Sequence, residues 1–164
     1  MKFAKVRNVK SPVRGTGKAA GIDFFVPDFG NNKGFIVKPG TDILIPSGIK
    51  AEIPEGYMLM AADKSGVVTS KWACLGASRS PKQDAFESII VIGAKIVDED
   101  YQGEIHIHLI NVGRAMVHIR PGMKIAQFIL VPVSYEGLEE VPETKLFSQH
   151  SERGEGALGS TGSY

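Results

Sequence analysis

Short runs of apolar and β-branched residues, separated by glycine and proline, recur along the whole chain. Few stretches carry the i, i+3, i+4, i+7 apolar spacing of an amphipathic helix. Eight runs instead have the composition of strands: 2–9, 21–27, 34–40, 41–62, 86–97, 103–113, 115–122 and 124–133. Pairs such as Pro39-Gly40 and Pro121-Gly122 separate them, and these residues favour tight turns. Many short strands between turns predict an all-β sandwich or barrel.

Composition narrows the class of protein. The chain has 164 residues, which suits one main domain, and 43% of them are hydrophobic. The formal net charge of +1 is too small to hold a nucleic-acid backbone by its electric field alone. The single cysteine, Cys74, excludes an intramolecular disulfide and fits a reducing compartment. Because we find neither a signal-peptide core nor an apolar run of about 20 residues, we expect a cytoplasmic protein that is not embedded in a membrane.

Two segments depart from the strand pattern. Residues 71–88 are polar, small and irregular, contain Trp72, and are typical of an insertion or a long loop. Residues 148–164 are rich in glycine and serine with almost no apolar side chain, so we expect a mobile C-terminal arm. The predicted organisation is a β domain over 1–147 and a flexible arm over 148–164.

Three consecutive acids, Asp98, Glu99 and Asp100, precede Tyr101 between two predicted strands. Clustered carboxylates repel one another, so they call for an explanation. In an extended strand, Asp98 and Asp100 would lie on one face, with Glu99 and Tyr101 on the other. Two carboxylates on one face suit a general base for water, or outer-sphere contacts to Mg²⁺. A solvated acidic hairpin tip is the alternative interpretation.

The C-terminal stretch GEGALGST spaces its glycines like a phosphate-binding loop. It lacks the lysine and the following helix of a P-loop, which argues against a P-loop NTPase. Its backbone N–H groups, with Arg153, Ser160 and Thr161, are suited to wrapping an anion. The alternative is a disordered tail without a function.

Two further stretches hold polar groups that suit an anionic ligand. In DKSGVV, residues 63–68, Lys64 supplies a cation, Ser65 a hydroxyl and Gly66 a close backbone approach, although such sequences are commonly plain turns. In KIAQFILV, Gln127 lies among apolar residues, so its amide needs a hydrogen-bond partner. A glutamine satisfied within the core is the simpler interpretation there.

His106 and His108 form an H-x-H pair of the kind that can bind a metal from one strand face. They alternate, however, with Ile105, Ile107 and Leu109. This alternation is typical of a half-buried strand with a polar outer face. We find no third ligand at a suitable spacing, so the pattern favours a strand without a metal.

Five stretches, taken in order along the chain, resemble the five motifs of the trimeric dUTPases. They are AAGIDFFVP (19–27), DKSG (63–66), GAKIVDEDYQGE (93–104), RPGMKIAQFIL (120–130) and RGEGALGSTG (153–162). The connection SGIKAEIPEGY (47–57) is also similar, so the resemblance covers nearly the whole chain except 71–88. It implies a distorted β jelly roll of the β-clip type, assembled as a homotrimer. It also implies Mg²⁺-dependent hydrolysis of dUTP to dUMP and pyrophosphate.

The resemblance further implies a role for each matching residue. Asp98 would be the general base that activates the water attacking the α-phosphorus, and Asp100 would support the turn. Tyr101 would lie under the deoxyribose and leave no room for a 2′-hydroxyl. Asp23 would contact Mg²⁺ through water. The other nucleotide-binding positions would be Lys64, Ser65, Gly66, Ile92, Ile96, Val97, His106, Gln127, Arg153, Leu158, Gly159, Ser160 and Thr161.

These positions fall into three groups by the part of dUTP that they would contact. Main-chain groups of the hairpin 92–97 would read uracil. Ser65, Gly66 and Gln127 would hold the phosphates. The arm residues from Arg153 to Thr161 would close over the ligand from a neighbouring subunit.

Several residues depart from the family pattern. Lys64 stands where the family usually has arginine, which removes a bidentate contact to phosphate. Leu158 replaces a phenylalanine that covers the base, Lys95 replaces a hairpin glycine, and Met123-Lys124 replaces an aspartate–arginine pair. One alternative is therefore a regulatory or protein-binding dUTPase-like protein that uses 71–88, with weak or altered nucleotide specificity. The related dCTP deaminases are a further alternative, which the uracil-type third motif disfavours.

Overall fold

The computed structural model describes residues 1–30, 34–68 and 89–156. The predicted insertion, 71–88, lies outside these ranges, as do Leu158, Gly159, Ser160 and Thr161 of the predicted arm. The chain divides into two compact units, Met1–Ser134 and Tyr135–Tyr164, and the predicted arm falls within the second.

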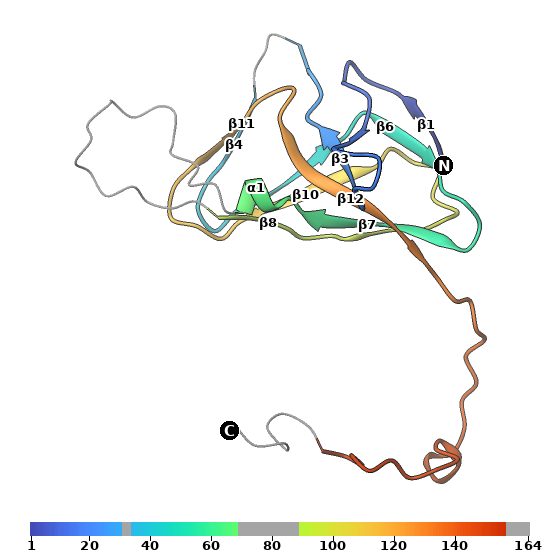
Figure 1. The fold of residues 1–164 in the computed structure, drawn as a ribbon. Coiled ribbons are helices and arrows are strands. Elements are labelled where there is room, and N and C mark those ends of the chain that lie inside the picture. Colours follow the sequence, from blue (N-terminus) through green and yellow to red (C-terminus); the bar gives the residue numbers. More distant parts are fainter. Residues whose placement is uncertain (31–33, 69–88, 157–164) are drawn as a thin grey trace. The chain divides into compact units, whose positions relative to one another are not determined.

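The largest sheet of the first unit has five strands, and each pairs antiparallel with its neighbours (Figure 1). In spatial order the strands are β2 (Val13–Arg14), β3 (Gly21–Phe25), β12 (Lys124–Pro132), β7 (Tyr57–Asp63) and β9 (Ile96–Val97). The long strand β12 lies at the centre of this sheet, so it borders both β3 and β7.

Three smaller antiparallel sheets complete the first unit. The first has the order β5 (Asp42–Pro46), β10 (His106–Asn111) and β8 (Ile90–Ile92). The other two pair β1 (Lys2–Lys5) with β6 (Ile49–Glu52), and β11 (Val117–Ile119) with β4 (Phe35–Val37).

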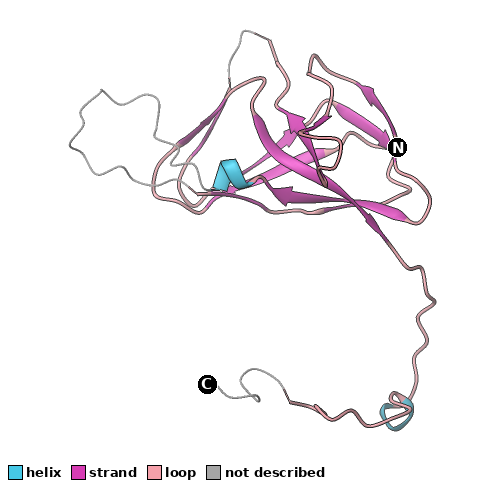
Figure 2. Cartoon of the chain, in the orientation of Figure 1, coloured by secondary structure: helices cyan, strands magenta, loops and turns pink. Residues whose placement is uncertain are grey.

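Among the described residues, strands far outnumber helical residues, which confirms the all-β prediction (Figure 2). All eight predicted runs contain at least one strand. The two-residue strand β2 was not predicted, because so short a pairing leaves no periodicity in the sequence. The turn predicted in DKSGVV is a single helical turn, α1 (Ser65–Val68).

One hydrophobic core draws on strands of these sheets. The rings of Phe24 on β3 and Phe128 on β12 lie 4.4 Å apart between centroids, and both side chains are buried. On β10, Ile107 and Leu109 are buried, while His106 and His108, which alternate with them, are not. This confirms the predicted half-buried strand. Burying each large apolar side chain contributes about 1.5–3 kcal/mol.

Asn111, at the end of β10, is a polar side chain with no exposed surface. Its amide nitrogen donates to the carbonyls of Val37 (3.0 Å) and Ala115 (2.8 Å), and its amide oxygen accepts from the Gly113 N–H (3.0 Å). The side chain therefore joins β10 to β4 and to the loop before β11, and every polar atom in it has a partner.

The described residues of the second unit contain the short 3-10 helix η1 (Glu143–Lys145) and a series of turns. Leu138 and Phe147 are exposed there, and Phe147 retains 78% of its accessible surface. Within the described residues of both units, neither helix has the length and apolar character needed to cross a membrane.

We predict that Asn111→Leu lowers the free energy of unfolding by about 2 kcal/mol, because it removes a hydrogen-bond partner from the buried Val37 contact and from the partly buried contacts with Ala115 and Gly113. Urea unfolding at one protein concentration measures the change. Lys2→Met is the control, since it removes an ion pair to Glu52 whose side chains are 85% and 67% exposed. That pair should contribute less than about 0.5 kcal/mol. Equal effects of the two substitutions would contradict the role assigned to Asn111.

Candidate active site

The acid cluster lies in a tight turn directly after β9. The Tyr101 N–H donates to the Asp98 carbonyl (3.2 Å), so the chain reverses between these residues and does not continue as a strand. The predicted alternation of faces is therefore wrong, because it assumed an extended backbone. Asp98, Asp100 and Tyr101 are exposed, whereas Glu99 is half-buried and accepts the Gly56 N–H (2.7 Å). The cluster thus contains one carboxylate that fixes the turn and two that face solvent.

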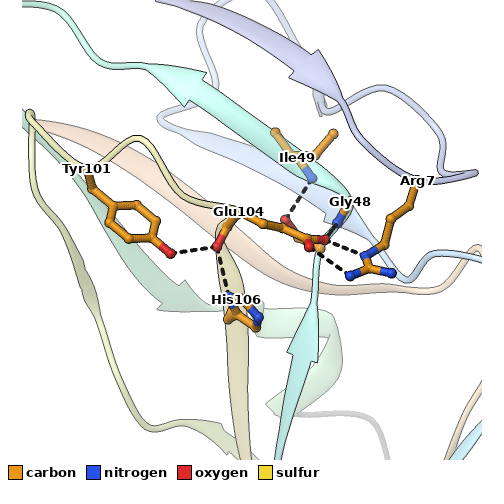
Figure 3. Close-up of polar contacts among 7 residues, drawn as sticks. Arg7, Gly48, Ile49, Tyr101, Glu104 and His106 are labelled. Carbon is orange, nitrogen blue, oxygen red and sulfur yellow. Dashed lines mark hydrogen bonds and ion pairs between the residues drawn. The ribbon is translucent and has the colours of Figure 1, made fainter.

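The Tyr101 side chain is held by the two residues that follow the turn. Its hydroxyl donates to the Glu104 carbonyl (2.9 Å), as Figure 3 shows. A Cβ atom at position 103 would collide with the phenol, so only glycine fits beneath the ring. The His106 ring also bonds the Glu104 carbonyl through Nδ1 (2.8 Å). Since a carbonyl only accepts, Nδ1 carries the proton.

The Glu104 carboxylate connects three separate segments of the chain (Figure 3). It accepts from Nε (2.7 Å) and Nη2 (2.9 Å) of Arg7 and from the Gly48 N–H (2.7 Å). The hydrogen bond from Arg7 lowers the pKa of Glu104 below its usual value; burial opposes this, and the Gly48 amide adds to it. The same contact raises the pKa of Arg7. Glu104 is therefore a fixed carboxylate.

The predicted base-reading hairpin runs from β8 to β9, and its backbone is fixed from two sides. The Ile92 N–H donates to Oδ1 of Asp63 (2.7 Å). The Gly93 N–H donates to the His108 carbonyl (3.0 Å), and the Ala94 N–H donates to Nδ1 of His108 (3.0 Å). These amides are used within the protein, so a base could not also take its hydrogen bonds from them.

Because Nδ1 of His108 accepts a hydrogen bond, Nε2 carries the proton in the neutral ring. This nitrogen lies 2.9 Å from Oδ2 of Asp42. The two histidines of the H-x-H pair therefore bind different partners. Among the residues that the structure describes, no group of three or more His, Cys, Asp or Glu side chains is arranged to hold a metal ion.

Gln127 lies on β12 between Asp23 of β3 and Ala62 of β7. Its Nε2 donates to the Asp63 carbonyl (2.8 Å), which confirms that its amide has a partner. A Cβ atom at Gly21 would collide with the Gln127 amide, which explains why β3 begins with glycine. Asp63 thus binds Gln127 through its carbonyl and the base-reading hairpin through its carboxylate.

Asp23 is buried, with 5% of its surface exposed, between two lysines. Oδ1 lies 2.8 Å from Nζ of Lys64, and Oδ2 lies 3.0 Å from Nζ of Lys124. Burial by itself would raise the pKa of Asp23, but hydrogen bonds and charge from the two lysines outweigh it, so the pKa is lowered. Asp23 therefore stays ionised at neutral pH.

The fold brings most of the predicted site residues of the first unit into two groups. Asp23, Lys64 and Gln127 meet across β3, β12 and the end of β7, with Ser65 and Gly66 directly following in α1. The second group is the turn after β9 with its neighbour His106. Along the hairpin, Ile92 is buried, Val97 is half-buried and Ile96 is exposed. Arg153 lies in the second unit, where its Nε donates to the Gly156 carbonyl (2.7 Å).

Sequence reasoning missed Asp63, Glu104 and Arg7. Asp63 begins the quoted stretch DKSG and Glu104 ends GAKIVDEDYQGE, so their places in these stretches are the signal that could have marked them, whereas no local feature marks Arg7. Their partners lie far away in sequence, 29 positions for Asp63 with Ile92 and 97 positions for Arg7 with Glu104. No local pattern could have matched such pairs.

Comparison with known proteins extends over nearly the whole chain. The dUTPase family model matches residues 7–162. A deoxyuridine 5′-triphosphate nucleotidohydrolase of Dictyoglomus turgidum is 35% identical over 145 residues, which cover 86% of this chain and 78% of the relative.

Solved structures show the same fold. The dUTPase of Staphylococcus bacteriophage 80alpha, solved with dUPNHPP, superposes with a TM-score of 0.76 at 23% identity, covering 98% of this chain and 97% of the other. A mutant dUTPase of phage phi11 of S. aureus, described with a structural Mg(II) ion, gives a TM-score of 0.66 at 22% identity over 87% of this chain and 96% of that one. On the match of the family model and the similarity to the Dictyoglomus protein, this chain belongs to the dUTPase family.

Proposed function

We propose that the protein hydrolyses dUTP to dUMP and pyrophosphate. Family membership supports the reaction, and the turn at residues 98–101 is the structural observation that carries the proposal. That turn presents an exposed carboxylate, Asp98, next to an exposed aromatic ring, Tyr101, whose orientation is fixed by hydrogen bonding. The proposal assigns the general base and the sugar-binding surface to this one turn.

Asp98 is proposed to accept a proton from a water molecule as its oxygen attacks the α-phosphorus. A new phosphorus–oxygen bond forms, the bond from the α-phosphorus to the bridging oxygen breaks, and pyrophosphate leaves. A base needs freedom to approach the water, and Asp98 is exposed on its turn. Its neighbour Glu99 holds the turn in place through the Gly56 N–H.

Recognition of the nucleoside is assigned to the hairpin and the turn. The amides of Ile92, Gly93 and Ala94 are bonded within the protein, and β9 is paired with β7 along one edge, so uracil is assigned to the main-chain groups of Ile96 and Val97 that do not face β7. Tyr101 would lie under the deoxyribose. His106 would line the nucleotide with Nε2, since Nδ1 already donates to the Glu104 carbonyl.

The phosphates are assigned to Lys64, Ser65, Gly66 and Gln127. The amide of Gln127 is fixed by the Asp63 carbonyl, and the two small residues start α1 beside it. Preorganised donors and cations of this kind stabilise charge that develops on a leaving pyrophosphate. Arg153, Leu158, Gly159, Ser160 and Thr161 are proposed to close over the ligand from a neighbouring subunit of a homotrimer, in the cytoplasm.

The residues fit Mg²⁺ only as an ion that the triphosphate brings with it. Asp23 is a single carboxylate with both oxygens paired to lysines, so it suits contact through water and not a direct ligand set. When bound, Mg²⁺ would neutralise charge on the phosphates. The structural Mg(II) ion described for the phage phi11 dUTPase supports magnesium as the metal.

The alternative regulatory role was based on residues 71–88 and Trp72. These residues lie outside the described ranges, so that role stays a prediction. The family match favours catalysis.

We predict that Asp98→Asn lowers kcat for pyrophosphate release from dUTP by about a thousandfold, the contribution of a positioned general base. Release should be confined to dUTP when dTTP, dCTP and UTP are assayed in parallel. Calorimetry with the α,β-imido analogue of dUTP should show binding to the variant. Glu55→Gln, which neutralises an exposed acid in another turn, is the matched control and should keep full activity. An active Asp98→Asn protein would overturn the assignment of the base.

The ionised state of Asp23, which its proposed contact with hydrated Mg²⁺ requires, can be tested through stability. Asp23→Asn should lower the free energy of unfolding by about 2 kcal/mol at pH 7, since both lysines lose a buried partner. Because the folded-state pKa lies below the usual value, this difference should stay constant from pH 8 to pH 5. It should shrink only as the pH falls below the usual aspartate value of 3.8. Urea unfolding as a function of pH measures it, and a difference that declines above pH 5 would contradict the lowered pKa.

A further inference from the structure

Glu104 makes two kinds of contact at once. Its carboxylate accepts three hydrogen bonds from Arg7 and Gly48, which come from the segment after β1 and from the turn between β5 and β6. Its carbonyl accepts the Tyr101 hydroxyl and the His106 ring (Figure 3). One residue thus joins distant parts of the chain to the proposed nucleoside-binding side chains.

The orientation of Tyr101 depends on its immediate neighbours, because 43% of its surface is exposed and packing alone does not fix an exposed ring. Gly103 leaves space for the phenol on one side. The hydroxyl then reaches a single point, the carbonyl of Glu104 at 2.9 Å. The position of that carbonyl therefore sets where the ring can lie.

The Glu104 backbone is in turn fixed through its side chain. The bidentate contact with Arg7 constrains distance and direction together, which one hydrogen bond does not. The glutamate side chain is only 14% exposed, so solvent weakens the pair little on that side. Arg7 is itself placed over the ring of Phe29, 5.6 Å from its centroid.

We propose that the Arg7–Glu104 pair is a positioning device for sugar selectivity. By fixing the Glu104 carbonyl, it keeps the Tyr101 ring where a ribose 2′-hydroxyl would collide with it. Neither residue touches the nucleotide in this proposal; both act through Tyr101. The inference rests on the proposed function, since it concerns the selectivity of that same site for deoxyribonucleotides.

The test compares kcat/KM for dUTP with kcat/KM for UTP. Arg7→Met and Glu104→Gln break the pair from either side, and the second keeps the size of the side chain. Each should reduce the dUTP-to-UTP ratio about tenfold, the effect of a small displacement of a positioned group. Tyr101→Phe, which removes the hydroxyl, should reduce it at least as much. The double variant Arg7→Met/Tyr101→Phe should lose no more than Tyr101→Phe alone, because both changes act on one interaction.

The ratio of kcat/KM for dUTP to kcat/KM for UTP distinguishes a displaced Tyr101 ring from a general loss of structure. A smaller folded fraction lowers the rates with both nucleotides equally and leaves their ratio unchanged. Lys2→Met is the matched control, because it breaks a different ion pair of the N-terminal segment, with Glu52, and does not touch Glu104. It should keep the wild-type ratio.

A measurement that does not depend on catalysis distinguishes the positioning role of the Arg7–Glu104 pair from the proposed hydrolysis of dUTP. In protein labelled with ¹³C at tyrosine, the ring signals of Tyr101, assigned with Tyr101→Phe, should shift in Glu104→Gln and Arg7→Met and stay in place in Lys2→Met. Unchanged ring signals and an unchanged ratio in folded Arg7 and Glu104 variants would overturn the positioning role while leaving dUTP hydrolysis intact. A wild-type protein that releases no pyrophosphate from dUTP would overturn the proposed function, and the ring signals would still decide whether the pair positions Tyr101.

Discussion

The pairing of β12 with β3 and β7 is the constraint on which the rest of the structure depends. In the observed register, Phe128 points into the core against Phe24, while Gln127 lies between Asp23 and Ala62 on the adjacent strands. Because side chains alternate along a strand, a slip of one residue would exchange the two environments. It would bury the amide of Gln127 in the core and expose the Phe128 ring. The core and the proposed phosphate site are therefore specified by the same register.

The carboxylates discussed above fall into two groups: those whose hydrogen bonds stabilise the fold, and the exposed carboxylate that is proposed to act as a general base. Asp23, Asp63, Glu99 and Glu104 each accept hydrogen bonds from backbone amides or cationic side chains. Asp98, by contrast, is exposed beyond the end of β9. A carboxylate whose oxygens accept hydrogen bonds from the protein is fixed in place, whereas a general base has to reach a water molecule and exchange a proton with it. Glu99 thus holds the turn that presents the proposed base, and Asp63 holds the hairpin before it.

Recognition through main-chain groups requires a rigid backbone, and this hairpin becomes rigid by using some of its own amides. Asp63 and His108 bind three consecutive N–H groups at its start. Asp63 also ties this hairpin to Gln127 through its carbonyl, so the proposed base-reading and phosphate-binding parts share one residue. A substitution at Asp63 would disturb both, although it contacts neither part of the nucleotide in the proposed arrangement.

The sequence by itself determined the all-β class, the positions of most strands and turns, and the residues with suitable chemistry, because alternation and turn preference are local properties. It also indicated that Gln127 needs a partner. It left open whether the acids at 98–100 continue a strand or form a hairpin tip, because the contact between Glu99 and Gly56, 43 positions away, leaves no local pattern. Nor could it pair Asp23 with two lysines or Arg7 with a glutamate 97 positions away. Only the tertiary structure decided these contacts, because which charges meet is set by strand register and by the approach of distant segments, neither of which leaves a local pattern in the chain.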